Sequence, residues 1–500
     1  MSEPPKLLRV LGPVGATAIV VGAVIGAGVF FKANIIARSV GRLDLVVLVW
    51  IVCGVVSLCG ALALAELAAA IPHAGGQYVY LRRAYGPLAG FLWGWTEFWV
   101  LRTGSVAALA VTFATAFRHS IAEELLAAGW LHASSADATT WELAGWQISA
   151  AGFDRLVAIT AIAALTLINI VGARWGGWVQ NITTVLKAGT LVALMVLPFV
   201  TGTADPSHWG STLTRPAELG AIAGFVAAMT AAFWAYDGWN NLSLVGEEVR
   251  EPQRNVPLAM GLGMFILIAL YLGAALAYHI VLSMDEIAGS QFVAATACER
   301  ILGSHGAAIA SAAVMVSTFG ALNANLLCGP RVIFAMARDR LVFAPLGRVH
   351  GRYHTPHFAI LAESVWSVVL ILASDLSRQV TVPQALDEFP AWLARPLRLS
   401  LEQMATKATF DVLTDFVIFG SFIFYVLSVA AVFVLRWREP DMPRPYRTWG
   451  YPFLPLGFVV VSTGFLVIML VTSPVESLAG LVFLGGGAVA YAVSRRQRVD

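Results

Sequence analysis

Two interrupted apolar segments carry the residues whose types suit the binding of a charged ligand. The stretch FWAYDGWNNL, residues 233–242, places an aspartate, a glycine and two asparagines inside an otherwise apolar run. The stretch GAVIGAGVF, residues 22–30, places three glycines inside another apolar run. Ionisable groups are costly and often functional inside a membrane span, and glycine commits the backbone only weakly to helix. Both patterns indicate unwound backbone at a binding site.

An unwound stretch inside a membrane has a definite chemistry. Unwinding frees N–H and C=O groups that lipid cannot satisfy. The N-terminus of a half-helix carries partial positive charge and suits a carboxylate, whereas freed carbonyls suit an ammonium group or a cation. A zwitterionic amino acid carries both charges on one carbon. The two stretches therefore predict a site for an amino acid substrate.

The spacing of the two stretches suggests how they meet. They fall in the first and sixth predicted spans, the relation expected when two five-helix repeats of opposite orientation each contribute a broken first helix to one site. Glycine has an alternative use, since Gly22 and Gly26 are four apart and would also suit close helix packing in a membrane. Packing does not explain the aspartate and amides of the second stretch.

The composition places the chain in a membrane. Of 500 residues, 58% are hydrophobic and 12% are charged, against about 25% charged residues in a soluble domain. Apolar runs of about 20 residues, enough to cross a bilayer, recur along the chain. We therefore expect an all-α polytopic membrane protein that forms a single transmembrane domain over residues 1–500. Its expected spans number about twelve, near residues 14–38, 44–70, 88–116, 154–171, 179–200, 220–246, 258–281, 306–336, 357–374, 412–436, 453–472 and 475–493.

The distribution of cations predicts the orientation. Eighteen of the 32 lysines and arginines lie in connections on the same side of the membrane as the N-terminus, and ten lie on the opposite side. This excess favours cytoplasmic N and C termini. The first residues, MSEPPKLLRV, run directly into an apolar segment without a secretory signal. We expect a multi-pass protein of the cell (inner) membrane. The net charge is +2, and the basic residues do not form a cluster that would suggest a nucleic acid partner.

Cofactor and enzyme motifs are absent from the sequence. The four cysteines lie mostly in apolar stretches without CxxC spacing, which is typical of buried small hydrophobic residues. The histidines have no metal-ligand pattern, and we expect neither a metal nor a cofactor. No Ser-His-Asp, HExxH or P-loop pattern is found, which disfavours an intramembrane enzyme and ATP drive.

Several motifs together resemble the amino acid–polyamine–organocation (APC) superfamily, and within it the L-type amino acid transporter branch. The family's helix 1 break is similar to GAGVF here, and its helix 6 motif is similar to WAYDGWNNLSLVGEEVREPQRNVP, residues 234–257. WTEFWVLRTGS and VQNITTVLK also match. The resemblance covers roughly residues 10–490. It implies alternating-access amino acid transport on a LeuT-like 5+5 inverted repeat plus two C-terminal helices. The first five-helix repeat would comprise residues 10–200, the inverted second repeat residues 218–437, and the two added helices residues 450–494.

The resemblance also implies a set of substrate-binding residues. The backbone of Gly26, Ala27 and Gly28 would bind the substrate carboxylate. Ala27 replaces the family's usual serine or threonine, which removes a hydroxyl but leaves the backbone donors. The substrate ammonium would be bound by main-chain carbonyls, those of Val24, Trp234, Ala235 and Asp237. The Trp234 ring would gate the site, and Asn240 would help to hold the broken helix.

Lys187 lies well inside the fifth predicted span. The resemblance implies that its ammonium replaces the sodium ion that bridges helices 1 and 8 in sodium-driven relatives. Transport would then be sodium-independent, with either exchange or proton coupling. The alternative is a lysine that snorkels to the membrane interface. A membrane sensor that binds an amino acid without transporting it is the alternative function, and it predicts binding without flux.

Other charged residues in the spans allow more than one interpretation. Asp237 would either face a cationic substrate side chain or cap the broken helix locally. Glu97 and Arg102 are five residues apart, which does not place them on one face of an α-helix, and we expect no mutual salt bridge. Glu66 is expected to satisfy the turn IPHAGG, residues 71–76.

Two connections between spans bear on partners. The outer insertion, residues 375–411, has apolar residues at roughly helical spacing, typical of an interfacial amphipathic helix; a lid for a partner is the alternative. The segment 118–154 contains no cysteine. Animal L-type light chains use a cysteine there to attach a glycoprotein, so we expect no disulfide-linked heavy subunit.

Overall fold

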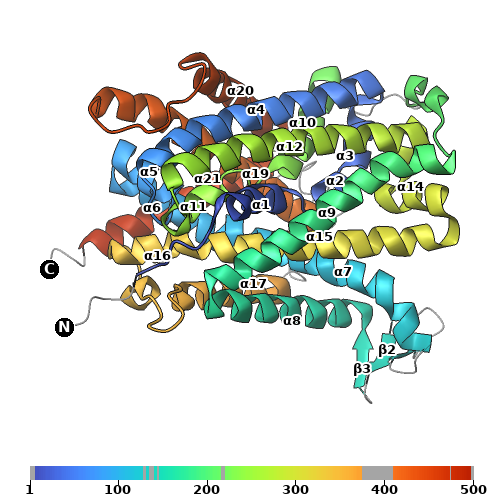
Figure 1. Cartoon of the computed structure of the whole chain (residues 1–500), viewed down its shortest axis with the longest axis horizontal. Helices are drawn as coiled ribbons and strands as arrows, with labels where there is room; N and C mark the ends of the chain where they lie inside the picture. The colour runs from blue at the N-terminus through green and yellow to red at the C-terminus, as the bar shows by residue number, and fades with distance from the viewer. Residues whose placement is uncertain are drawn as a thin grey trace, which may run out of the picture.

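The computed structural model describes residues 6–127, 131–133, 140–143, 146–214, 220–373, 409–472 and 474–496. Long helices run side by side in one bundle (Figure 1). Ten helical segments of the described chain are long and apolar enough to span a membrane, and two shorter apolar helices accompany them. The expected all-α polytopic class with about twelve helices is confirmed. An amphipathic helix was predicted within residues 375–411. Residues 375–408 lie outside the described part of the chain, so this helix stays a prediction.

The first half of the chain contains the helices α1 (Pro13–Val24), α2 (Gly28–Phe31), α3 (Ala33–Val40), α4 (Leu43–Ala70), α5 (Gln77–Tyr85), α6 (Pro87–Thr96), the π-helical turn η1 (Glu97–Arg102), α7 (Thr103–Ala127), α8 (Ala150–Val171) and α9 (Ala173–Thr201). The next part contains η2 (Pro206–Gly210), α10 (Ala221–Tyr236), α11 (Asn241–Leu244), η3 (Gly246–Glu248), α12 (Pro252–Val281), α13 (Met284–Gly289), α14 (Val293–Leu302) and η4 (Gly303–His305). The last part contains α15 (Gly306–Cys328), α16 (Pro330–Arg338), η5 (Ala344–Gly347), α17 (His357–Ala373), α19 (Thr409–Arg438), α20 (Phe453–Thr472) and α21 (Pro474–Arg496).

One predicted boundary was wrong. The fifth span was expected to begin near residue 179, after a connection formed by GARWGGW. Only Gly172 separates α8 from α9, which begins at Ala173. Trp175 and Trp178 are 58% and 60% exposed. They lie on the first turns of this helix, where tryptophan is common at a membrane surface. The glycines between them are tolerated because the helical hydrogen bonds continue through the segment.

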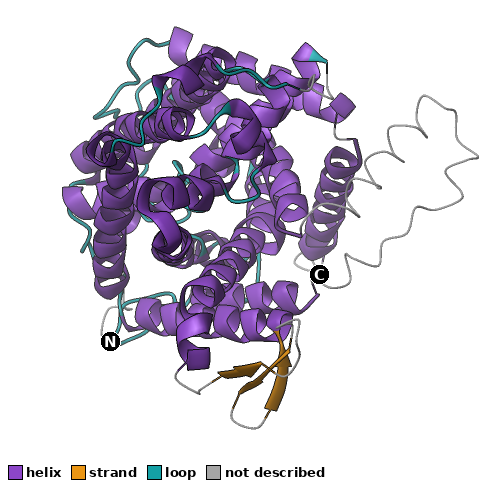
Figure 2. Ribbon diagram, turned by 90° about the vertical axis from the view of Figure 1, so that its right-hand side faces the viewer, coloured by secondary structure: helices purple, strands orange, loops and turns teal. Residues whose placement is uncertain are grey.

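A small antiparallel sheet follows α7 and was not predicted. It consists of β1 (Leu131–Ala133), β2 (Thr140–Leu143) and β3 (Trp146–Ser149), with β2 in the centre. Figure 2 shows these strands projecting from the helix bundle. The hairpins are short and precede α8, so they extend a connection at one end of the bundle without entering its core.

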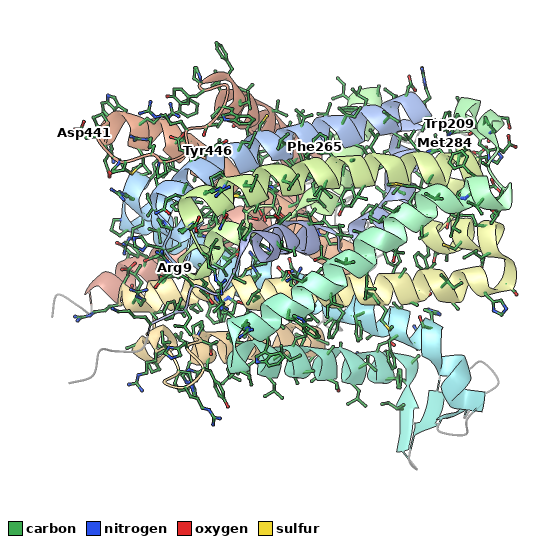
Figure 3. All side chains as sticks on the ribbon, viewed as in Figure 1. Arg9, Trp209, Phe265, Met284, Asp441 and Tyr446 are labelled. Atoms are coloured by element: carbon green, nitrogen blue, oxygen red, sulfur yellow. The ribbon has the colours of Figure 1, made fainter. Side chains whose placement is uncertain are left out.

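The outer surface of the bundle is apolar along the helices. On α12, Phe265 (labelled in Figure 3) is 67% exposed, as expected for a residue that faces lipid. Arg9 and Asp441 lie at one end of the bundle, and Trp209 and Met284 lie at the opposite end (Figure 3). The chain enters α1 and leaves α21 at the same end (Figure 1).

Both predicted helix interruptions are present. Helix α1 ends at Val24 and α2 begins at Gly28, so residues 25–27 are not helical. Helix α10 ends at Tyr236 and α11 begins at Asn241; Gly238 between them has φ of +105°, a conformation that suits glycine. The two breaks meet closely, because a Cβ atom on Gly28 would lie 2.7 Å from the Cα atom of Ala235.

The close approach predicts the effect of Gly28→Ala. The added methyl group would collide with the backbone of Ala235, and relief requires that α2 and α10 move apart. We expect a loss of about 1–3 kcal/mol in the free energy of unfolding, the usual range for overpacking. Unfolding of the purified protein by denaturant, followed by tryptophan fluorescence, measures this loss. The matched control is Gly189→Ala, because a Cβ atom at that position in α9 meets nothing within 4 Å. Equal stability of the two variants would contradict the close contact.

Candidate functional site

A small cavity lies between the two helix breaks. Its volume is about 40 Å³, which is room for a few water molecules. Seven of the eight residues expected to bind substrate line it: Val24, Gly26, Ala27, Gly28, Trp234, Ala235 and Asp237. Three polar residues of the wall were not among those expected to bind substrate, namely Ser105 on α7, Asn241 on α11 and Asn325 on α15. The breaks of α1 and α10 thus face one cavity together with two further helices.

Backbone donors begin at the break in the first helix. The N–H groups of Phe30 and Phe31 donate to the carbonyl of Ala27 at 3.1 Å. The helix continues from Gly28 through Lys32 into α3, since the Lys32 N–H donates to the Gly28 carbonyl at 2.8 Å. The first N–H groups of such a segment have no acceptor within the helix and carry partial positive charge. Ala27 and Gly28, at this start, lie in the cavity wall.

Tyr271 contacts two of the carbonyls expected to bind the substrate ammonium. Its hydroxyl lies 2.8 Å from the carbonyl oxygen of Val24 and 3.0 Å from that of Ala235. A tyrosine hydroxyl has one proton and donates to one acceptor at a time. Tyr271, on α12, therefore joins the two breaks. A tyrosine in an apolar span gives no sequence signal for this role.

Asp237 lies at the end of a chain of side-chain hydrogen bonds. The Tyr425 hydroxyl donates to Asp237 Oδ1 at 2.6 Å. The same hydroxyl lies 3.4 Å from Asn240 Oδ1, and Asn240 Nδ2 donates to Gln77 Oε1 at 2.5 Å. Gln77 Nε2 in turn donates to Ser428 Oγ at 3.1 Å. This chain fastens the second break to α5 and α19.

The position of Asn240 differs from that of the other expected site residues. Its side chain is 1% exposed and lies behind the cavity, among Gln77 and Tyr425, and it does not line the cavity wall. Asn241 lines the wall instead. Asp237 lines the cavity and accepts a hydrogen bond from Tyr425 on α19, a residue that is distant in the sequence.

Lys187 is fully buried, with 0% of its surface exposed. Its ammonium donates to the carbonyls of Gly22 and Ile25 at the end of α1, at 2.7 and 2.8 Å. It also donates to the carbonyl of Ser317 on α15 at 3.0 Å. The three donors of the ammonium are thus used, and a lysine that snorkels to the interface is excluded. Lys187 bridges the first broken helix and α15, as the sodium-replacement hypothesis requires.

The expectation for Glu97 and Arg102 was wrong. Arg102 Nε donates to Glu97 Oε1 at 2.9 Å, and Arg102 Nη2 contacts the same oxygen. Residues 97–102 form a π-helical turn, in which the hydrogen bonds run from i to i+5. This wider turn brings residues five apart onto one face. Arg102 Nη1 also donates to Asn325 Oδ1, whose residue lines the cavity.

Glu66 was also assigned the wrong contact. It does not bind the turn at residues 71–76, where Glu247 accepts a hydrogen bond from the Ala74 N–H at 3.1 Å. The end of α4 faces α19 instead, and Glu66 binds Arg436 at 2.6 and 2.8 Å. It also accepts from the Thr448 N–H at 2.7 Å. Glu66 therefore fastens α4 to α19 and to the connection before α20.

Asn323 serves helix packing. Its side chain joins Asn169 on α8 to Gly176 and Gln180 on α9, at 2.9 to 3.0 Å. Of the two asparagines on α15, Asn325 lines the cavity and Asn323 does not.

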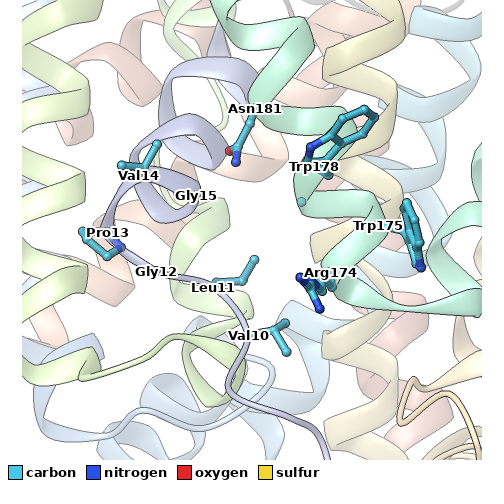
Figure 4. A pocket seen from close by; sticks show the side chains of 11 residues that line it. Val10, Leu11, Gly12, Pro13, Val14, Gly15, Arg174, Trp175, Trp178 and Asn181 are labelled. Atoms are coloured by element: carbon cyan, nitrogen blue, oxygen red, sulfur yellow. The ribbon is translucent and has the colours of Figure 1, made fainter.

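A larger hollow of about 680 Å³ lies elsewhere, between the segment before α1 and the first turns of α9 (Figure 4). Valine, leucine and exposed tryptophan side chains line it, with Arg174 as its charged residue. None of its described lining residues is a carboxylate, and none belongs to the expected substrate site. No group of three or more metal-ligating side chains occurs in the part of the chain that the structure describes.

Comparison with known proteins agrees with this geometry. The family described as Amino acid permease matches residues 11–484. The chain is 30% identical to the serine/threonine exchanger SteT of Bacillus subtilis, over 99% of each chain. It is 28% identical to the human large neutral amino acids transporter small subunit 2, over 97% of this chain and 80% of that protein. It is 26% identical to the human b(0,+)-type amino acid transporter 1, over 98% of this chain and 89% of that protein.

These matches extend over nearly the whole chain and include both broken helices and the helix that carries Lys187. The chain therefore belongs to the amino acid permease family.

Proposed function

We propose that this protein is a sodium-independent amino acid transporter that works by alternating access, in the exchange mode stated for its relative SteT. The observation that carries the proposal is the pair of helix breaks that face one cavity, with Lys187 bridging α1 and α15. The ammonium occupies backbone carbonyls of the broken helix that a sodium ion would otherwise bind. The transport cycle therefore needs no bound sodium.

The same geometry suggests how an amino acid would bind. Its carboxylate would accept hydrogen bonds from the backbone N–H groups of Ala27 and Gly28. The N–H of Gly26 would join them once its bond to the Val24 carbonyl, 2.7 Å long in this structure, is released. The substrate ammonium would donate to the carbonyl of Ala235, which has a second lone pair beside the Tyr271 contact. It would also donate to the carbonyl of Val24 once the bond that this carbonyl accepts from the Gly26 N–H is released. The cavity of about 40 Å³ is smaller than an amino acid. Substrate entry therefore requires that the two breaks separate, which is the conformational step of alternating access.

Trp234 is suited to act as the gate of this site. Its ring lies beside Gly28, since a Cβ on that glycine would come within 3.2 Å of the ring. Lys32 lies over the same ring, 5.3 Å from its centroid. Movement of α2 would carry Lys32 away from the ring and open the cavity on that side. A neutral L-amino acid fits this arrangement, and a cationic one would add contact with Asp237.

The membrane and its orientation are part of the proposal. The excess of lysine and arginine on the side of the membrane that holds the N-terminus supports cytoplasmic termini in the cell (inner) membrane. The four cysteines are free, and two of them are buried in the bundle. We propose that the chain works without a disulfide-linked heavy subunit.

Purified protein in liposomes tests the function. We expect radiolabelled serine or alanine to enter only when the liposomes contain an unlabelled amino acid, at a rate that is unchanged when potassium replaces sodium. Liposomes without internal amino acid are the control. Saturable binding with no flux under any loading would contradict transport, and a requirement for sodium would contradict the assigned role of Lys187.

Substitution of Lys187 tests the bridge between α1 and α15. Lys187→Ala removes a donor from three buried carbonyls, of which that of Ile25 keeps the Ser317 hydroxyl at 3.1 Å. Each carbonyl left unsatisfied costs about 1–3 kcal/mol. We expect exchange to fall at least roughly tenfold, because 1.4 kcal/mol already corresponds to a factor of ten. Initial exchange rates, corrected for the amount of folded protein, measure the effect. The control is Val185→Ala on the lipid-facing side of α9, where the side chain is 72% exposed. Full activity of the alanine variant would overturn the proposed role.

Asp237→Asn separates the two interpretations of this carboxylate. If Asp237 faces a cationic side chain, the variant should weaken competition by lysine or arginine more than competition by alanine. If it only positions the break through Tyr425, all substrates should weaken equally. Tyr425→Phe should then have the same effect, and the double variant should add nothing further, as expected for two residues in one interaction. Competition for exchange by a panel of amino acids measures both outcomes.

A further inference from the structure

Glu363 is a buried acid that the proposed transport site does not use. It lies on α17, is 1% exposed, and its Oε1 atom is buried without a hydrogen-bond partner among the described residues. The charged side chains near it are those of Arg102, Glu97 and Arg331. A buried ionised carboxylate without hydrogen bonds is very costly, and such a group becomes neutral instead.

The two neighbouring cations already bind carboxylates, although Nη1 of Arg331 is buried without a hydrogen-bond partner among the described residues. Arg331 donates to Glu248 at 2.8 and 3.1 Å, and both side chains are almost completely buried. Arg102 donates to Glu97 and to Asn325. Each guanidinium therefore has its own carboxylate partner, and neither donates a hydrogen bond to Glu363.

The balance of charge around Arg102 identifies which acid carries a proton. Three carboxyl groups interact with this single cation, namely Glu97, Asp237 and Glu363. Glu97 accepts hydrogen bonds from Arg102 itself, and Asp237 accepts one from Tyr425. Glu363 has neither kind of donor. Like charges in one buried site cannot all remain ionised, and the acid without a donor takes the proton.

The other helices packed against α17 do not change this balance. Its main neighbours are η1, α7, α8, α15, α16 and η5. The charged groups that face Glu363 from η1 and α16 are those already named. Helix α8 presents the hydroxyl of Thr166 to Ser364 at 2.6 Å, and α15 contributes the Cys328 thiol near Arg102. No additional charge reaches Glu363 from the described part of these elements.

Close packing connects Glu363 to the substrate cavity. A Cβ atom on Gly329 would lie 2.6 Å from Glu363 Oε2 and 2.5 Å from Arg102 Cγ, so the glycine lets the acid approach the stem of Arg102. Arg102 donates in turn to Asn325, which lines the cavity. One arginine thus lies between the cavity wall and the buried acid, and its partner on the cavity side belongs to α15, the helix that Lys187 joins to α1.

We propose that Glu363 is a proton-binding site, protonated in this closed conformation, whose proton is exchanged when α15 moves away from Arg102. Loss of the contact with Asn325 frees Arg102 to donate to Glu363, and the acid then transfers its proton to water and becomes a carboxylate. Closing the site again requires that a proton from water returns to Glu363. The link between this proton and amino acid movement rests on the proposed function, whereas the protonation of Glu363 does not.

The first test measures the proton directly. Infrared spectroscopy of the purified protein at neutral pH should show the carbonyl band of a protonated carboxylic acid that is absent in Glu363→Gln. Glu299→Gln, which replaces an exposed carboxylate on α14, should keep the band. Because glutamine is a neutral isostere of the protonated acid, Glu363→Gln should fold as well as Glu299→Gln. No loss of the band in Glu363→Gln, or a loss of folding confined to that variant, would show that Glu363 is ionised and would overturn the proposal.

The second test measures the coupling. In proteoliposomes the exchange rate of the natural chain and of Glu299→Gln should fall as pH rises, with a limiting slope of roughly tenfold per pH unit for one linked proton. Glu363→Gln should exchange amino acids without this dependence on pH, because the site can close around a neutral glutamine without binding a proton. The same slope in Glu363→Gln would overturn the coupling. Absence of flux in every variant, with the infrared difference present, would reject transport and leave the proton site in place.

Discussion

Backbone polar groups at the centre of a membrane must find partners within the protein, and the rest of this structure depends on that constraint. Ending α1 at Val24 and α10 at Tyr236 frees carbonyls that lipid cannot satisfy. Lys187 supplies donors at one side of the first break, and Tyr271 supplies a donor between the two breaks. The helices that carry these two residues, α9 and α12, are held in place by the backbone that they satisfy.

The buried charges obey a related constraint, because an ion removed from water needs a partner of opposite charge. Glu66 pairs with Arg436, and Glu248 pairs with Arg331. Each pair joins helices that are distant in the sequence, α4 to α19 and η3 to α16. Both pairs involve residues near helix ends, since Glu66 lies near the end of α4 and Arg331 at the start of α16. Arg102 instead has two acids near it, Glu97 and Glu363. This cation lies next to the cavity, where a change of partner is possible without breaking either pair.

The sequence contained enough information for the breaks and for Lys187, but not for their partners. An aspartate, amides and glycines in a span are conspicuous by residue type, and a lysine far from a span end is equally so. Tyr271 and Ser105 carry no such signal, since tyrosine and serine are ordinary within membrane helices. The Glu97–Arg102 pair was predicted wrongly because the spacing argument assumed an α-helix, whereas one π-helical turn changes which residues share a face. Local geometry of this kind follows from packing against distant helices and not from the local residues.

The number of donors at the break offers a physical reason for exchange. In the closed structure the Val24 carbonyl accepts from the Gly26 N–H at 2.7 Å, and it shares the one hydroxyl proton of Tyr271 with the Ala235 carbonyl. A substrate ammonium brings three donors to the same place, so the loaded site satisfies these carbonyls more fully than the empty one. A transporter whose broken helices have more hydrogen-bond partners with substrate than without it changes conformation more readily when substrate is bound. Return of the loaded carrier is then favoured over return of the empty one, and that preference is the defining property of an exchanger.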